Sequence, residues 1–337
     1  MKAVVIGSGA LGLGFIAERL AADYDLCLVD TTARAKTLNS IAVNGGFLVN
    51  ICALDGVAAR EVIGFIDVAL FDDPKCIEQV RDADLVLTCT GRNILDGLVA
   101  RIAPAMNSSG KRQWLLFCEN GLDIASAYAS HFGEHVTLVD TVMSRMCRFA
   151  GDDESCYEPM WAGAAERLVV EEYDLLPVES DLCDDGPFSA AFSMVSRDEF
   201  LCWEDIKLYL HNGMHAFVSY HAHLEGAEFF HETSERIRQS ARRVALEEVV
   251  PAIAKTHKSN QDEIEHYVIS LLDRFVNPYF NDRIDRGIRG VEEKLLPGER
   301  LLGGCEYIRR AGIEPKGYSS TIEAGKEILR RSMEAVR

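Results

Sequence analysis

A glycine-rich turn lies directly after the first apolar segment and constrains the fold more than any other feature of the chain. The segment "AVVIG" (3–7) runs into "GSGALG" (7–12), and an amphipathic helical pattern follows from residue 10 to 22. In a strand–turn–helix unit this G-x-G-x-x-G spacing lets the backbone approach a pyrophosphate and points the helix N-terminus at it. A glycine turn kept for packing alone is the alternative. The context favours a dinucleotide site at Gly7, Gly9, Ala10, Leu11 and Gly12.

The second apolar segment, "LCLVD" (26–30), ends in a carboxylate, Asp30. An acid at this place, roughly 20 residues after the glycine turn, binds the ribose hydroxyls of an adenosine and repels a 2′-phosphate. The pattern therefore predicts NAD as the cofactor rather than NADP. Arg34 follows soon after and leaves room for some use of NADP, and FAD remains an alternative.

Short apolar segments and helical patterns alternate through the first half of the chain. "DLVLTCTG" (84–91), "QWLLFCEN" (113–120) and "HVTLVDTV" (136–143) are rich in Val and Leu, which is typical of buried parallel strands. They predict an α/β class with an N-terminal doubly wound Rossmann sheet. Residues 42–71 are interpreted as inserted strands or a hairpin, and 166–180 as a strand beside or extending the sheet. Helical periodicity begins near residue 198, so we expect an NAD-binding domain over 1–190 and a mostly α-helical substrate domain over 191–337.

Charge and composition exclude several classes of function. The 337 residues carry a formal net charge of −18, which disfavours binding to nucleic acid or to an anionic membrane. Neither a signal peptide nor an apolar run of about 18 residues is found. Ten cysteines without a C-x-x-C pair are typical of reduced thiols in a cytoplasmic protein. A small-molecule partner is expected, with monomer and homodimer both left open.

One predicted helix carries an unusual set of polar side chains in "KLYLHNGMH" (207–215), just before the apolar "AFVSY". At about 100° per residue, an α-helix would place Glu204, Lys207, His211, Asn212 and His215 on one arc. Such an arc indicates a solvated face, a metal site or a hydride-transfer site. The two histidines lack the third ligand that zinc sites of this kind use, so no metal is predicted. A lysine can accept a hydroxyl proton, and an amide and an imidazole can orient the oxygen.

The spacing K-x4-N-x2-H in this helix, behind an N-terminal NAD domain, resembles the polyol-specific long-chain dehydrogenases. The segments "CEN" (118–120), 87–106 and "NPY" (277–279) are similar to that family as well. The resemblance implies an NAD-dependent dehydrogenase acting on a CH–OH group. It implies that Lys207 is the general acid/base, that Asn212, His215 and Asn120 position the substrate oxygen, that Glu204 serves proton exchange with solvent, and that Thr90 and Gly91 lie at the cofactor.

The substrate is predicted from a cluster of cations within residues 283–300. Acidic residues are interleaved with them, so a salt-bridged surface is the alternative to an anion site. By resemblance to the mannitol 1-phosphate branch, Arg286, Arg289 and Lys294 would hold a phosphate, and the reaction would interconvert mannitol 1-phosphate and fructose 6-phosphate. The same cations would suit a hexuronate reductase of the fructuronate or tagaturonate type.

Two departures from the family bear on these predictions. The family's usual Asp-Arg is replaced by Ser144-Arg145, which removes a substrate contact or charge, and the helical tail is short. These departures support a second class of function, a non-catalytic NAD-binding regulator. Retention of the Lys–Asn–His set argues against that class, since a sensor needs no base. A dehydrogenase of a non-sugar hydroxy compound is a third reading.

Overall fold

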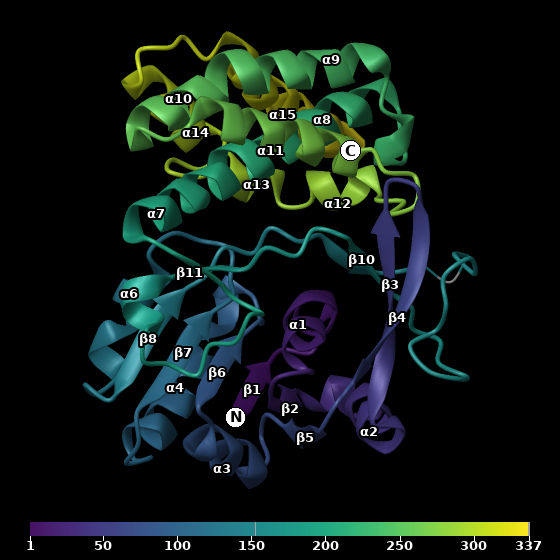
Figure 1. Ribbon diagram of the computed structural model, residues 1–337. Coiled ribbons are helices and arrows are strands. Elements are labelled where there is room, and N and C mark those ends of the chain that lie inside the picture. The colour runs from purple at the N-terminus through teal and green to yellow at the C-terminus, as the bar shows by residue number, and fades with distance from the viewer. Residues whose placement is uncertain (152, 336–337) are drawn as a thin grey trace. The chain divides into compact units, whose positions relative to one another are not determined.

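The computed structural model describes residues 1–151 and 153–335, which form two compact units, Met1–Phe200 and Leu201–Arg337 (Figure 1). The boundary between the two units lies after Phe200, whereas the helical periodicity of the sequence predicted a domain boundary after residue 190. The strands of the first unit are β1 (Lys2–Ile6), β2 (Asp25–Asp30), β3 (Gly46–Ala53), β4 (Gly56–Ile63), β5 (Ile66–Leu70), β6 (Leu85–Thr88), β7 (Gln113–Phe117), β8 (Val136–Asp140), β9 (Cys147–Phe149), β10 (Leu168–Glu171), β11 (Pro177–Glu179) and β12 (Ser193–Val195). Its helices are η1 (Gly12–Ala17), α1 (Glu18–Leu20), η2 (Thr32–Arg34), α2 (Ala35–Asn44), α3 (Pro74–Asp82), η3 (Arg92–Ile94), α4 (Leu95–Asn107), α5 (Ile124–Tyr128), η4 (Ala129–His131) and α6 (Ser180–Cys183).

Six parallel strands form the main sheet of the first unit in the order β5-β2-β1-β6-β7-β8. Alternate side chains enter cores on opposite faces: Val4 and Ile6 pack on the α3–α4 side, and Ala3 and Val5 pack on the other. Because both faces of the sheet are covered, the residues of each strand are apolar almost without interruption. This arrangement confirms the predicted Rossmann sheet.

A second sheet, in the order β4-β3-β10-β9, covers part of the first unit. The inserted segment 42–71 forms the antiparallel β3–β4 hairpin and then β5, which joins the edge of the parallel sheet beside β2. Figure 1 shows the long hairpin apart from strands β6, β7 and β8. Segment 166–180 supplies β10, which pairs with β3 rather than extending the parallel sheet.

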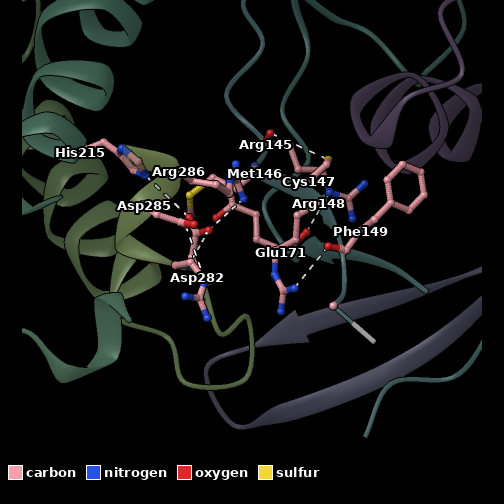
Figure 2. A network of polar contacts seen from close by, with 12 residues as sticks. Arg145, Met146, Cys147, Arg148, Phe149, Glu171, His215, Asp282, Asp285 and Arg286 are labelled. Atoms are coloured by element: carbon pink, nitrogen blue, oxygen red, sulfur yellow. Dashed lines mark hydrogen bonds and ion pairs between the residues drawn. The ribbon is translucent and has the colours of Figure 1, made fainter. Parts of the chain in front are cut away.

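Arg145 joins the first helical segment to the second sheet. Its Nε donates to the Glu171 carbonyl at 2.8 Å, and its Nη1 donates to Glu18 at 2.7 Å. The Arg145 and Glu18 side chains are 1% and 3% exposed, and Glu18 also pairs with the more exposed Arg60 of β4. Figure 2 shows Arg145 and Glu171 among the residues of β9 and β10. Ser144 is buried beside it, so the position that departs from the family lies inside the first unit.

The second unit is helical. After α7 (Arg197–Asp205), which crosses the division, it contains η5 (Ile206–His211), α8 (Asn212–Glu225), η6 (Phe230–Glu232), α9 (Glu235–Val244), η7 (Ala245–Val249), α10 (Val250–His257), α11 (Gln261–Phe275), α12 (Ile284–Ile288), α13 (Val291–Lys294), α14 (Leu302–Arg310) and α15 (Lys316–Ala335). Helix α8 packs against α12 and α15. Within residues 1–151 and 153–335, no helix combines the length and apolar character needed to cross a bilayer.

The helix that carries Lys207 is not regular, because Ile206–His211 is a π-helical turn. Tyr318 of α15 supports this turn. Its hydroxyl lies 3.0 Å from the Tyr209 carbonyl and 2.6 Å from the Arg300 carbonyl, and can donate its proton to either. A Cβ at Gly213 would come within 2.1 Å of that hydroxyl, so only glycine lets α15 approach here. Single π-helical turns inside α-helices occur frequently at functional sites.

We predict that Arg145→Met lowers the free energy of unfolding by about 3–5 kcal/mol, because it leaves the buried Glu18 carboxylate without its innermost cation. Arg60→Met should cost about 1 kcal/mol or less, since Arg60 is largely exposed. Thermal unfolding followed by circular dichroism measures both. Equal losses in the two variants would contradict a structural role for the buried pair.

Candidate functional site

The glycine turn after β1 leaves an open space beside its middle glycine. Gly7 has φ +106°, and a Cβ there would lie 2.3 Å from the Cys89 carbonyl oxygen. A Cβ at Gly12 would lie 1.8 Å from the Gly7 carbonyl oxygen, whereas a Cβ at Gly9 would meet no atom within 4 Å. Gly7 and Gly12 are thus required by packing alone, and Gly9 is not. The space at Gly9 fits the approach of a pyrophosphate to the backbone.

Ala10 and Leu11 are the first residues of the helix that runs over residues 10–20. Its first N–H groups have no partner within the helix and carry the positive end of its dipole, which suits an anion. The predicted residues Gly7, Gly9, Asp30 and Thr90 line one cavity of about 450 Å³. Its other lining residues are Ile6, Thr31, Phe71, Cys89, Ile94, Gly97 and Leu98.

Asp30 is held by the glycine turn itself. Its Oδ2 accepts both the N–H and the hydroxyl of Ser8 at 2.7 Å, and its Oδ1 accepts the Thr31 N–H at 2.7 Å. A carboxylate has about four acceptor positions, so one remains on Oδ1 for a ribose hydroxyl. The residues present therefore fit an adenosine ribose, although a second hydroxyl would require Ser8 to turn away.

A buried carboxylate that sequence reasoning missed holds the loop after β6. Glu119, which is 6% exposed, accepts the N–H groups of Thr90 and Gly91, both at 2.8 Å. The pairing fixes the backbone of the two residues expected at the cofactor. The signal was present in "CEN", where only the asparagine was considered. Asn120 follows Glu119 and is exposed in the first unit.

The remaining predicted catalytic residues lie in the second unit on the helix around residues 201–225. Glu204, Lys207, Asn212 and His215 are all half-buried. The regular α-helix assumed for their shared arc is interrupted by the π-helical turn over 206–211, which changes the angle between residues before and after it.

His211 is buried and does not share a polar face with the others. Its Nδ1 lies 3.1 Å from the Tyr267 hydroxyl, and its ring packs edge-on to Phe275. Burial, and then the nearby charges of Lys207 and Arg274, hold the pKa of His211 well below its usual range. We therefore assign it a packing role as a neutral imidazole.

His215 lies next to a buried acid, Asp282, one of the acids whose interleaving with the cations made a salt-bridged surface the alternative to an anion site. The His215 Nε2 lies 3.7 Å from Asp282 Oδ2, and Asp282 Oδ1 accepts Arg286 at 2.9 Å (Figure 2). The ring of His215 packs at a tilt against Phe230, with centroids 4.6 Å apart. Burial lowers the pKa of His215 while Asp282 opposes that shift, so the ring is neutral near pH 7.

The three predicted anion-binding cations differ in their surroundings. Arg286 is paired with Asp282, as the salt-bridge alternative expected, and Arg289 is exposed. Lys294 donates to the Gly287 carbonyl at 2.7 Å. Burial, and then the charge of Arg300, lower the pKa of Lys294 to about 8. Such a lysine would be stabilised in its charged form by an anion.

Metal ligation was also considered for the histidines. Among the residues that the structure describes, no three side chains of His, Cys, Asp or Glu are grouped as metal ligands.

Residues 199–322 match the model of a family described as the mannitol dehydrogenase C-terminal domain. The chain is similar to the mannitol-1-phosphate 5-dehydrogenase of Talaromyces marneffei, with 25% identity over 334 residues that cover 96% of this chain and 84% of that protein. The enzyme of the same name from Aspergillus niger is 25% identical over 340 residues, covering 98% of this chain and 85% of its own.

Solved structures share the fold at lower identity. The mannitol 2-dehydrogenase of Pseudomonas fluorescens, in a ternary complex with NAD and D-mannitol, matches with a TM-score of 0.74 and 16% identity over 96% of this chain and 78% of its own. A substrate-free D-sorbitol dehydrogenase matches with a TM-score of 0.74 and 16% identity over 98% and 80% of the two chains.

Substitutions at Gly9 and Gly12 test whether the glycine turn binds a ligand or serves packing alone. We predict that Gly9→Ala changes the free energy of unfolding by about 0.5 kcal/mol or less, because its Cβ enters open space. It should weaken NADH binding at least about tenfold, because that space would be needed by the pyrophosphate. Gly12→Ala should lower thermal stability outright. Calorimetric titration with NADH and thermal unfolding measure the two effects, and unchanged NADH binding by Gly9→Ala would leave the turn a packing device only.

Proposed function

We propose that the chain is a member of the mannitol dehydrogenase family, as its match over residues 199–322 and its similarity to mannitol-1-phosphate 5-dehydrogenases support, and that it acts as an NAD-dependent polyol dehydrogenase. Its reaction would interconvert a sugar alcohol phosphate and a ketose phosphate, most simply mannitol 1-phosphate and fructose 6-phosphate. The observation that carries the proposal is the set Lys207, Asn212 and His215. These residues lie on one helix inside the matched segment 199–322.

The cofactor would be held by the first unit. The backbone at Gly9 and the helix N-terminus over Ala10–Gly12 suit its pyrophosphate, Asp30 suits the adenosine ribose, and Glu119 presents Thr90 and Gly91. The nicotinamide, when bound, supplies the site that takes or gives the hydride. A carboxylate at the end of β2 favours NAD over NADP, because it repels a 2′-phosphate.

Proton transfer would fall to the second unit. Lys207 exchanges the proton of the substrate hydroxyl, and Glu204, which precedes it on the same helix, exchanges that proton with solvent. Asn212 and His215 donate to the substrate oxygen and stabilise the charge that grows on it. A neutral His215 carries a single N–H, so its donation to the substrate oxygen requires that proton on Nδ1, because Nε2 faces Asp282 Oδ2 at 3.7 Å.

We predict that Lys207→Ala lowers kcat at least about 1,000-fold while the Kd for NADH changes by less than about threefold, because only the proton-transfer group is lost. Stopped-flow turnover and NADH fluorescence titration measure the two quantities. Lys326→Ala, which removes an exposed lysine of α15, is the matched control and should leave both unchanged. Turnover that survives Lys207→Ala would overturn the mechanism.

The substrate class is tested by a panel of ketoses in the reductive direction. Fructose 6-phosphate, fructose, fructuronate and tagaturonate are compared by the oxidation of NADH. Preference for the phosphate would support Arg286, Arg289 and Lys294 as phosphate ligands. Preference for a hexuronate would assign the same cations to a carboxylate and keep the mechanism. No turnover with NADH bound would favour the regulator.

Lys294 makes the phosphate preference depend on pH. Because its pKa is about 8, it is cationic below pH 8 and neutral above. A sugar phosphate keeps the same charge over pH 7–9, since its second pKa is about 6. We therefore predict that the ratio of kcat/KM for fructose 6-phosphate to that for fructose falls about tenfold as the pH rises through 8.

The ratio cancels any effect of pH on the chemical step that both substrates share. In Lys294→Met the ratio should be low throughout and should no longer change with pH. A wild-type ratio that stays flat from pH 7 to 9 would show that Lys294 does not contact the phosphate.

A further inference from the structure

Two segments that are remote in the chain meet next to the end of β2. Arg34, at the end of η2, forms an ion pair with Glu166, which lies just before β10. The guanidinium also donates through Nη2 to the Ser8 carbonyl at 3.3 Å, and it lies over the Phe149 ring, 5.0 Å from the centroid. Its position is therefore set on several sides, and the side chain is only 23% exposed.

Glu166 is itself fixed, because its second carboxylate oxygen accepts the hydroxyl of Thr37 at 2.8 Å. Thr37 is buried in α2. The carboxylate thus bridges the first residues after β2 and the second sheet. An acid held by two partners at defined geometry keeps its cation better than a mobile surface acid does.

Arg34 stands where a dinucleotide-binding chain would use a cation for NADP. The 2′-phosphate of that cofactor lies beside the end of the second strand, and an arginine there accommodates it. Arg34 follows Asp30 closely enough for this task, and Asp30 and Thr31 line the cavity. Arginine suits phosphate because its planar fork makes paired hydrogen bonds. The guanidinium of Arg34, however, is already paired with Glu166.

We propose that Glu166 is a cofactor-specificity residue, which withholds Arg34 from a 2′-phosphate and so enforces the choice of NAD over NADP. The inference rests on the dinucleotide site of the proposed function. Asp30 repels the phosphate directly, and Glu166 removes the cation that could offset the repulsion. The preference would then require two acids from different parts of the chain.

The test compares the Kd values for NADH and NADPH by protein fluorescence titration, which needs no turnover. In Glu166→Gln the amide keeps the side-chain volume and can still accept the Thr37 hydroxyl, while the ion pair is lost. We expect the ratio of the NADPH Kd to the NADH Kd to fall about tenfold, since one charge-assisted contact becomes available. Glu179→Gln, which breaks a different ion pair, to Arg197, is the control and should leave the ratio unchanged.

A second variant separates release of Arg34 from simple loosening of the loop. Arg34→Met breaks the same ion pair from the other side and removes the cation, so the ratio should not fall. Adding Arg34→Met to Glu166→Gln should abolish the gain. An unchanged ratio in Glu166→Gln, or an equal gain in Arg34→Met, would overturn the inference. Failure of the wild-type protein to bind NADH would instead overturn the dinucleotide site.

Discussion

The close contact between the glycine turn and the end of β6 is the constraint on which the first unit depends. Gly7 lies so near the Cys89 carbonyl, and Gly12 so near Gly7, that no side chain fits at either place. This contact joins β1 to β6 and sets where the helix over residues 10–20 begins. The cavity lies beside Gly9, the middle glycine of the turn, where a Cβ would meet no atom within 4 Å.

Carboxylates organise both units of this acidic chain. Asp30 holds the glycine turn through Ser8, Glu119 holds the loop at Thr90, and Asp282 holds His215 and Arg286. Each accepts two or more hydrogen bonds, which offsets the free-energy cost of taking a carboxylate out of water. These three acids are therefore internal supports within a chain whose net charge is −18.

The helix around Lys207 joins an irregular backbone to a positively charged neighbourhood. His211 lies buried in the π-helical turn, and burial, followed by the charges of Lys207 and Arg274, holds its pKa well below the usual range. The Tyr318 hydroxyl supports the turn at the Tyr209 carbonyl. Single π-helical turns inside α-helices occur frequently at functional sites, which agrees with the substrate chemistry proposed for this helix.

Much of this protein was determined by its sequence alone, because the signals are local. The strand–turn–helix unit, the apolar parallel strands, Asp30 and the Lys–Asn–His spacing all depend on residues close together in the chain. Only the tertiary structure showed that β3, β4, β9 and β10 form a second sheet and that His211 is buried in a π-helical turn. It also showed that His215 lies next to Asp282 and that Arg34 is paired with Glu166. These depend on the partners that remote segments bring to a side chain, and on backbone irregularity, which local periodicity does not contain.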